Sequence, residues 1–274
     1  MKLEPFRLDD IAPFLKLAAT EHWVVEPWEF EFLLSAFSRG CFTARRDTGE
    51  TTGFVTSLRH DRSGWIGNLI VSSEYRGEGI GESLFAAAFE ALRSEGVETF
   101  WLTASKSGER LYKKYGFNGI DSIVRWVGTG RRRSPVYDLQ REAHNSGGSV
   151  SGIDRQAWGD RRDSLLAETA GRGVLLLQES GFIVIQPSGS ARQFGPFSAL
   201  DSGSAERLFY DAAKSVAPGG RMLVDSPASN QSACRLFTES GMKISGSNSL
   251  MFAGKKPEYR PDLVYGLATM GSCG

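Results

Sequence analysis

The clearest pattern of apolar and polar positions in the chain is a strand joined to a helix by a glycine-rich turn. Apolar residues from Trp65 to Val71 predict the strand, and apolar residues at helical spacing from Ile80 onward predict the helix. Glycines stand at positions 77, 79 and 81, between the two elements. The N–H groups at a helix start lack intrahelical partners, and glycine leaves the backbone bare, so such a turn can bind a diphosphate.

Two better-known phosphate-binding motifs do not match this turn. A P-loop requires Lys and then Ser or Thr after its last glycine, but Glu82 and Ser83 stand there. A dinucleotide-binding fingerprint has the order G-x-G-x-x-G, whereas these glycines alternate. The pattern R-x-x-G-x-G, from Arg76 to Gly81, instead resembles motif A of the GNAT superfamily of N-acetyltransferases. The resemblance implies a loop that holds the pyrophosphate of acetyl-CoA; a plain tight turn is the alternative.

A second motif of the same family follows downstream. Residues 100–104 predict a strand, and residues 108–114 predict a short helix. The family pattern N-x-x-A-x-x-L-Y-x-x-x-G-F is matched at Tyr112, while Ser105 replaces its Asn and Gly108 its Ala. The resemblance implies that Tyr112 is catalytic and protonates the departing CoA thiolate. The alternative is an aromatic residue of the core with a satisfied hydroxyl.

The resemblance also implies the residues that bind acetyl-CoA as co-substrate. In the family the strand before motif A splays from its neighbour, and its free backbone binds the pantetheine arm. The residues expected to bind the cofactor are Leu69, Ile70, Val71, Arg76, Gly77, Glu78, Gly79, Ile80, Gly81, Glu82 and Ser83. Trp23 and Glu26 are candidates for the acceptor pocket. The general base is not identified by sequence; candidates from the family layout are Glu21, His22, Glu26 and His60.

The remaining elements of the first half fit the same family. A strand is predicted for residues 3–8, and Asp9-Asp10 is expected to cap the helix that follows. A second helix is predicted to end near Phe37, and residues 41–46 and 53–58 predict a hairpin. The resulting β-α-α-β-β-β-α-β-α-β order resembles that of the family across residues 1–128.

The second half repeats the first in a weaker form. Asn230, Ala233, Leu236, Phe237 and Gly241 reproduce the spacing of the Tyr112 motif. Upstream, Gly203-Ser204-Ala205 falls where the glycine turn of the repeat is expected. The chemistry is absent, however, because a phenylalanine replaces the tyrosine and Leu200 replaces the arginine. The resemblance is therefore to tandem acetyltransferases in which only the first domain binds acetyl-CoA productively.

The fold class expected is α/β (α+β), with two tandem GNAT-like domains that each have a mixed, mostly antiparallel sheet flanked by helices. The expected domains are residues 1–130 (intact acetyltransferase), 131–150 (linker) and 151–274 (degenerate copy). Three arginines, Arg131 to Arg133, are interpreted as part of a solvated connector in preference to a phosphate contact. The run 264–268 and the residues after it are expected to pack near the catalytic cleft and to shape acceptor specificity.

Composition argues against nucleic-acid-binding, membrane-binding and metal-binding classes of protein. The 274 residues include 32 Lys and Arg against 32 Asp and Glu, a formal net charge of zero, which argues against nucleic acid or anionic membrane as a partner. No signal peptide or run of ~18 apolar residues is present, so a cytoplasmic location is expected. Three cysteines and three histidines show no metal-ligand spacing, so no metal is expected.

The expected function is direct transfer of acetyl from acetyl-CoA to an amine, carried either by a small molecule or by a protein or peptide. Two alternatives remain open at this stage. The first is a non-catalytic acyl-CoA-binding or sensing protein, and the second is an interaction protein in which both halves are scaffold. The identity of the amine and the oligomeric state, monomer or homodimer, also stay open.

Overall fold

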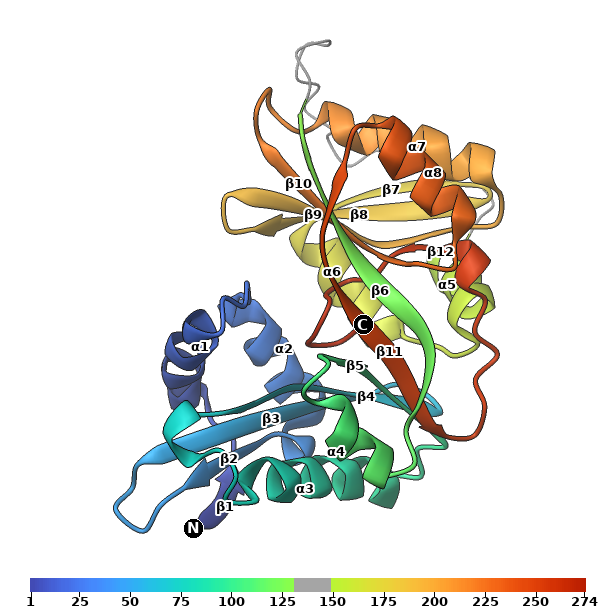
Figure 1. Ribbon diagram of the computed structural model, residues 1–274. Helices are drawn as coiled ribbons and strands as arrows, with labels where there is room; N and C mark the ends of the chain where they lie inside the picture. The colour runs from blue at the N-terminus through green and yellow to red at the C-terminus, as the bar shows by residue number, and fades with distance from the viewer. Residues whose placement is uncertain (131–148) are drawn as a thin grey trace.

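The computed structural model describes residues 1–130 and 149–274. The predicted connector with Arg131 to Arg133 lies outside these described residues. The chain forms two lobes, one from each half, and two long strands, β6 and β11, run through both (Figure 1).

One mixed sheet of twelve strands extends through the described residues, in the order β1-β2-β3-β4-β5-β11-β6-β10-β9-β8-β7, with β12 paired to β9. The strands are β1 (Lys2–Pro5), β2 (Phe42–Arg45), β3 (Thr51–Arg59), β4 (Ser63–Val71), β5 (Thr99–Ala104), β6 (Asn118–Thr129), β7 (Val174–Gln178), β8 (Gly181–Ser188), β9 (Ala191–Ala199), β10 (Arg221–Pro227), β11 (Lys243–Gly254) and β12 (Val264–Gly266). Pairing is antiparallel except between β4 and β5 and between β9 and β10.

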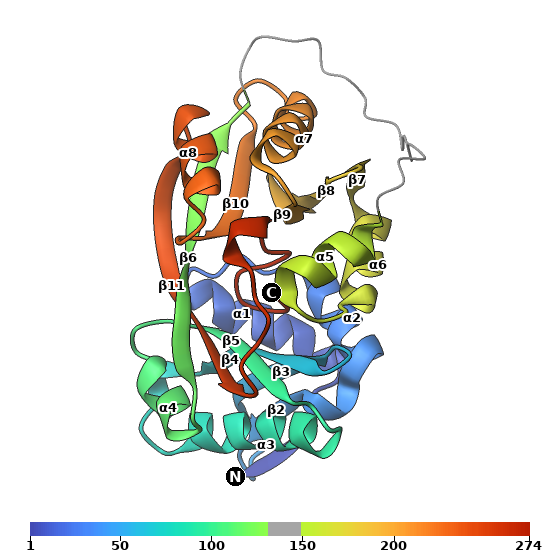
Figure 2. The same ribbon diagram turned by 90° about the vertical axis from the view of Figure 1, so that its right-hand side faces the viewer.

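Helices cover the sheet on both faces. In the first half, α3 and α4 lie on one face and α1 and α2 on the other (Figures 1 and 2). The helices are α1 (Ile11–Thr20), α2 (Pro27–Phe37), α3 (Ile80–Ser94), α4 (Glu109–Lys114), α5 (Val150–Trp158), α6 (Asp163–Arg172), α7 (Ser202–Lys214) and α8 (Gln231–Glu239). Short 3₁₀ helices span Leu8–Asp10, Ser38–Gly40, Ser73–Tyr75 and Pro261–Leu263. A mixed, mostly antiparallel sheet flanked by helices confirms the expected fold class.

Two local expectations differ from the structure. The first strand ends at Pro5, and the residues expected to continue it enter the 3₁₀ helix at Leu8. Gly203-Ser204-Ala205, expected to form a turn, lies inside α7. The reason is that Asp201 has extended backbone and its carboxylate accepts a hydrogen bond from Ser204 N, so the helix begins at Ser202.

The two halves exchange their last long strands. Strand β11, from the second half, pairs with β5 and β6 of the first, and β6 pairs in turn with β10 of the second half. Arg125 on β6 reinforces this exchange through a two-point ion pair with the fully buried Asp225 on β10. The sheet is therefore continuous past residue 130, and each half contributes a strand that pairs within the sheet of the other.

Strands β4 and β5 separate beyond a short paired region. Their parallel pairing covers only Ser63 to Trp65 on β4, although β4 continues to Val71. A bulge bends β4 at the same place, since Asn68 and Leu69 together lie opposite a single residue of β3. Asn68 has a positive φ of 54°, a conformation that Asn tolerates better than most residues. The backbone of β4 that faces β5 is consequently left without a strand partner over this stretch.

The last residues of the chain return to the first half, against β4. Trp65 Nε1 donates to Gly271 O at 3.4 Å, and Thr103 Oγ1 on β5 donates to Met270 O at 2.5 Å. Position 67 must be glycine, because a Cβ there would lie 2.2 Å from Gly271 O. The segment Thr269–Gly274, below called the C-terminal segment, thus lies centrally between the two lobes (Figure 2).

Candidate active site

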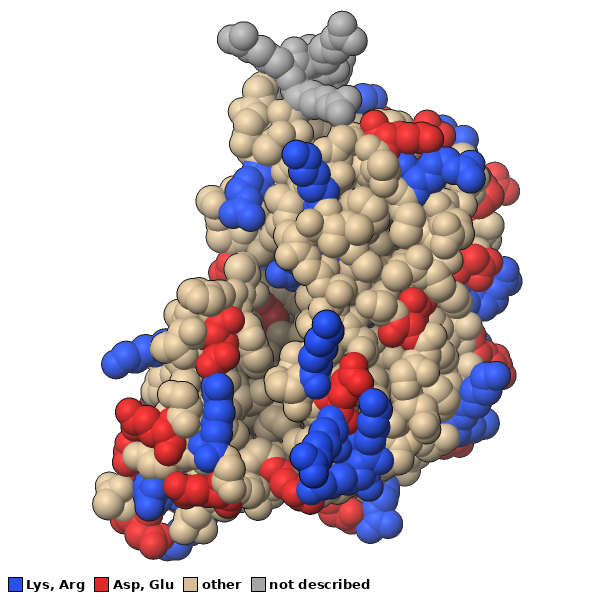
Figure 3. All heavy atoms as spheres, viewed as in Figure 1, with Lys and Arg blue, Asp and Glu red and all other residues tan. Residues whose placement is uncertain are grey.

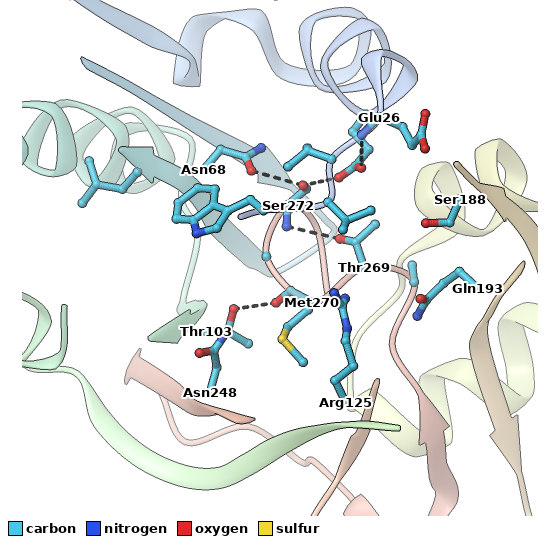
Figure 4. A pocket seen from close by; sticks show the side chains of 18 of the residues that line it. Glu26, Asn68, Thr103, Arg125, Ser188, Gln193, Asn248, Thr269, Met270 and Ser272 are labelled. Atoms are coloured by element: carbon cyan, nitrogen blue, oxygen red, sulfur yellow. Dashed lines mark hydrogen bonds between the residues drawn. The ribbon is translucent and has the colours of Figure 1, made fainter. Parts of the chain in front are cut away.

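A cavity of about 270 Å³ lies between the lobes, where β4 and β5 separate. The hollow is visible between the lobes on the surface (Figure 3). Its walls come from both halves: residues 22–29 and strands β4 to β6 from the first, and strands β8, β9 and β11 with the C-terminal segment from the second (Figure 4). The expected placement of the final residues near the cleft is therefore confirmed. A cavity of this size, rich in polar side chains, suits a small ligand or a short chain end.

The carboxyl group of Glu29 is the most perturbed acidic group in this cavity. Its side chain is 5% exposed, and burial raises its pKa from 4.5 to about 7, against the lowering effect of hydrogen bonds from Ser272 and from Glu26 N. Glu29 is the third helical residue of α2, and its Oε1 accepts from Glu26 N at 2.8 Å, while its Oε2 contacts Ser272 of the C-terminal segment, which covers it. A carboxyl group with a pKa near 7 can act as a general base at neutral pH.

Ser272 connects Glu29 to Asn68. Its hydroxyl lies within hydrogen-bond distance of Glu29 Oε2 and of Asn68 Oδ1. The Asn68 amide orientation follows from Thr56, whose hydroxyl donates to Gly67 O at 3.4 Å and therefore accepts from Asn68 Nδ2 at 3.0 Å. A serine has one proton to donate, so both contacts are satisfied when a protonated Glu29 donates to Ser272 and Ser272 donates to Asn68. When Glu29 is ionised, the Ser272 hydroxyl donates its hydrogen bond to the Glu29 carboxylate instead, and Asn68 Oδ1 is left without a donor.

Of the four base candidates from the sequence, Glu21 and Glu26 are engaged, His60 lies outside the cavity, and His22 lines it. Glu21 pairs with Arg76, and Glu26 Oε1 accepts from Gly189 N of the second half at 2.5 Å. His22 lines the cavity, with a φ of 58°. His60 lies outside the cavity, and burial lowers its pKa to about 3. Glu29 was not among the candidates from the sequence. The signal that could have identified it is a Glu at the third helical position, three residues after the N-cap Glu26.

Tyr112 lies at the cavity wall, on α4. Its ring packs against Phe85 of α3 at a centroid distance of 5.0 Å, and burial raises the pKa of its hydroxyl to about 12. The departure at Gly108 has a steric reason, because a Cβ there would lie 3.0 Å from the Tyr112 ring. Ser105, the other departure, also lines the cavity, and its hydroxyl accepts from Gly108 N at 3.3 Å. A neutral phenol in this place can donate a proton.

The glycine turn has the geometry of an anion site. Gly77 and Gly79 have φ of 90° and 80°, and a Cβ at either position would meet no atom within 4 Å. Across the described chain, the N–H groups of residues 77–82 donate to no protein acceptor; the first such bond of α3 runs from Ser83 N to Gly79 O. The corresponding helix of the second half differs, since Asp201 places a carboxylate at the start of α7. That carboxylate occupies the donors and repels an anion.

The other predicted cofactor residues surround this turn. Leu69 lines the cavity, whereas the side chain of Ile70 is buried in the core on the α1–α2 face. Arg76 Nε donates to Val71 O at 3.0 Å, and its guanidinium pairs with Glu21, so the arginine braces the turn. Glu78 and Ile80 lie in the turn and at the start of α3, and Glu82 Oε2 accepts from Lys114.

The acceptor candidates both lie at the cavity. Trp23 lines it with a side chain that is 41% exposed, and Glu26 lies on the side nearest the second half. No cluster of three or more His, Cys, Asp or Glu side chains able to hold a metal ion occurs within residues 1–130 and 149–274. Over the same ranges, no helix combines the length and apolar character needed to cross a membrane.

Both halves match acetyltransferase families. The model described as the acetyltransferase (GNAT) family matches residues 8–117, and a second one, described as an acetyltransferase (GNAT) domain, matches residues 150–266. A Bacillus subtilis protein provisionally named a ribosomal protein bS18-alanine N-acetyltransferase is 25% identical over 139 residues, which are 44% of this chain and 91% of that protein.

Solved structures extend the likeness to the whole chain. A provisionally named acetyltransferase from Pyrococcus horikoshii is 25% identical, with a TM-score of 0.85 over 100% of this chain and 95% of its own. A GCN5-related N-acetyltransferase from Sphaerobacter thermophilus shares the fold at 15% identity, with a TM-score of 0.66 over 94% of this chain and 96% of that one. The tandem arrangement expected from the sequence is confirmed.

Proposed function

Because this chain belongs to the GNAT family of acetyltransferases, with one domain of the family in each half, we propose that it transfers an acetyl group from acetyl-CoA to an amine bound between the lobes. The observation that carries the proposal is the shared position of three features. The separated strands β4 and β5, the hydroxyl-bearing Tyr112 and the buried carboxyl of Glu29 all lie at one cavity.

Acetyl-CoA is assigned to the first half alone. Its pyrophosphate would bind the free N–H groups at Gly77 to Glu82, and its pantetheine arm would lie along the edge of β4 from Leu69 to Val71 that faces β5 and has no strand partner there. The second half offers no equivalent site, since the Asp201 carboxylate caps α7 and Phe237 replaces the tyrosine. One molecule of acetyl-CoA per chain is therefore the expected stoichiometry.

The proposed reaction needs two proton carriers. The amine nitrogen attacks the thioester carbon and forms a C–N bond. The C–S bond then breaks, so that the acetyl group is on the nitrogen and the CoA thiolate departs. Glu29, as carboxylate, takes the proton from the amine, and Tyr112 gives a proton to the CoA thiolate. Burial favours both roles, because it makes the carboxyl more basic and keeps the phenol protonated.

Direct transfer is favoured over a route through an acetylated cysteine. A cysteine nucleophile reacts as the thiolate, which needs a lowered pKa. Cys41 and Cys273 are buried and their pKa values are raised to about 12, and the pKa of Cys234 is also raised by burial. Raised pKa values keep the thiolate fraction small at neutral pH, which disfavours a cysteine nucleophile.

Release of free thiol from acetyl-CoA in the presence of a panel of amines tests the proposal. The panel should contain sugars with a primary amine, simple alkyl amines, polyamines, amino acids and peptides with a free N-terminus. Amine-dependent release by the natural protein, reduced in Tyr112→Phe, supports it. Tight binding of acetyl-CoA with no amine-dependent release would instead indicate an acyl-CoA-binding or sensing protein.

A further inference from the structure

Two glutamines of the second half face the cavity with a fixed orientation. Gln186 on β8 donates both of its amide protons to backbone carbonyl groups of the protein, to Gly195 O at 2.5 Å and to Ala268 O at 3.1 Å. Gln193 on β9 donates from Nε2 to the Asp225 carboxylate at 3.2 Å. Carbonyl and carboxylate oxygens can only accept, so the nitrogen of each amide must point at them.

What remains for a ligand is the oxygen of each amide. Both side chains line the cavity and are nearly buried, with exposures of 2% and 6%. Across the described residues, Oε1 of Gln186 and Oε1 of Gln193 accept no hydrogen bond. A ligand that left these oxygens unpaired would incur the cost of two desolvated acceptors, so a ligand with O–H or N–H groups is favoured.

Donors complete the same region of the cavity. Arg125 uses Nε and Nη2 on Asp225, at 2.7 Å each, while Nη1 donates to no group in the described chain. The side-chain amide of Asn248 likewise has no partner among these residues and lines the cavity. Figure 4 shows Gln193 and Ser188 on one side of the pocket and Asn248 on the other, with Arg125 between them. Acceptors and donors are therefore mixed.

Mixed donors and acceptors distinguish the chemical classes of amine. A second ammonium group would satisfy the two amide oxygens, but it can only donate, so Nη1 of Arg125 would be left without an acceptor. An alkyl group would leave every one of these groups unpaired. Hydroxyl groups both donate and accept, so they match the amide oxygens of Gln186 and Gln193 as well as the donors of Arg125 and Asn248.

We propose that the acceptor is a small primary amine that carries several hydroxyl groups, as amino sugars do, with its nitrogen at Glu29 and its hydroxyls on Gln186, Gln193, Arg125 and Asn248. This inference rests on the proposed function and names the substrate class for the same site. The degenerate half then has a chemical role, since it supplies most of the groups that recognise the hydroxyls.

The test compares four acceptors with the full-length protein: glucosamine, cyclohexylamine, spermidine and a peptide with N-terminal alanine. Acetyl-CoA is kept constant, and kcat/KM is measured from thiol release. Glucosamine is expected to exceed each of the others by about tenfold or more, since each unmatched hydrogen bond weakens binding several-fold. A higher kcat/KM for cyclohexylamine, spermidine or the peptide overturns the inference while leaving the proposed function standing. No acetylation of any amine overturns the proposed function itself.

Two variants test the recognising groups. Gln193→Met should lower the ratio of kcat/KM for glucosamine to that for cyclohexylamine about tenfold, whereas Gln178→Met, the same substitution on β7 outside the cavity, should leave this ratio as it is in the natural protein. Asn248→Leu, on the opposite wall, should lower the same preference, so the test does not depend on one variant folding. An unchanged preference in folded Gln193→Met or Asn248→Leu protein contradicts the assignment.

Discussion

Replacing Glu29 by glutamine should inactivate the protein and at the same time stabilise it. A glutamine at this position reproduces the protonated carboxyl, because its oxygen can accept from Glu26 N and its nitrogen can donate to Ser272. Ser272 then donates to Asn68 Oδ1, so every contact of the protonated state is kept. The substitution removes only the ability to ionise.

The gain in stability follows from the pKa. Folding raises the pKa of Glu29 from 4.5 to about 7, which corresponds to roughly 3 kcal/mol. Below pH 4.5 the carboxyl is protonated in both the folded and the unfolded chain, so it costs nothing. As the pH rises to 7 the unfolded chain ionises first, and above pH 7 the full cost is present. The free energy of unfolding of Glu29→Gln should therefore exceed that of the natural protein by about 3 kcal/mol at pH 8. At pH 4.5 the two free energies should be nearly equal.

The loss of activity should be large and should change the pH profile. Removal of a general base costs roughly 10²- to 10⁴-fold in rate. In the natural protein kcat/KM should fall about tenfold per pH unit below 7, because the carboxylate is the active form. Glu29→Gln should lack this acidic limb. Glu31→Gln, the same substitution at an exposed position of α2, serves as control and should alter neither property.

Urea unfolding at pH 5 and pH 8, together with pH profiles of thiol release, measures both effects. A stability difference between Glu29→Gln and the natural protein that does not grow with pH would refute the raised pKa. Full activity in Glu29→Gln with an intact acidic limb would refute the assignment as base.

Three further predictions address the other groups. Gly79→Glu should abolish the binding of acetyl-CoA measured by calorimetry, because its carboxylate would repel the pyrophosphate and a side chain is strained at a φ of 80°. An unchanged affinity would contradict the assignment of the loop. Tyr112→Phe should lower kcat by roughly 10²-fold with little change in acetyl-CoA affinity, and an unchanged kcat would leave Tyr112 a packed aromatic. Ser272→Ala should move the acidic limb of kcat/KM to higher pH, because the lost hydrogen bond lowers the pKa of Glu29, whereas Ser188→Ala should leave that limb in place.

Local patterns in the sequence predicted the parts of the site that local chemistry determines. Glycines at 77 and 79 indicated a turn with bare backbone before a helix, and both have the positive φ that suits glycine. The spacing of the Tyr112 motif predicted a short helix for that residue, and the structure has it on α4, at the cavity wall. The helical periodicity after Ile80 gave α3 its correct beginning.

Long-range pairing could not be predicted in the same way. The exchange of β6 and β11 depends on contacts such as Ser249 with Ala104, which no local periodicity specifies. Glu29 escaped notice for a related reason. Its burial depends on the C-terminal segment, and its partner Ser272 is 243 residues away in the chain. The helical start at Ser202 was missed for a different reason, since the turn expected at Gly203 to Ala205 was wrong although Asp201 is a favoured N-cap residue.

Single-turnover transfer of a labelled acetyl group tests the central proposal most directly. Acetyl-CoA with a ¹³C-labelled acetyl group is mixed with an excess of protein and with glucosamine, and the products are followed by mass spectrometry. We expect labelled N-acetylated amine in an amount equal to the free CoA formed, no labelled protein at any time, and loss of product in Glu29→Gln. Label on a cysteine of the protein, or acetyl-CoA that stays bound and intact in the presence of every amine of the panel, would contradict it.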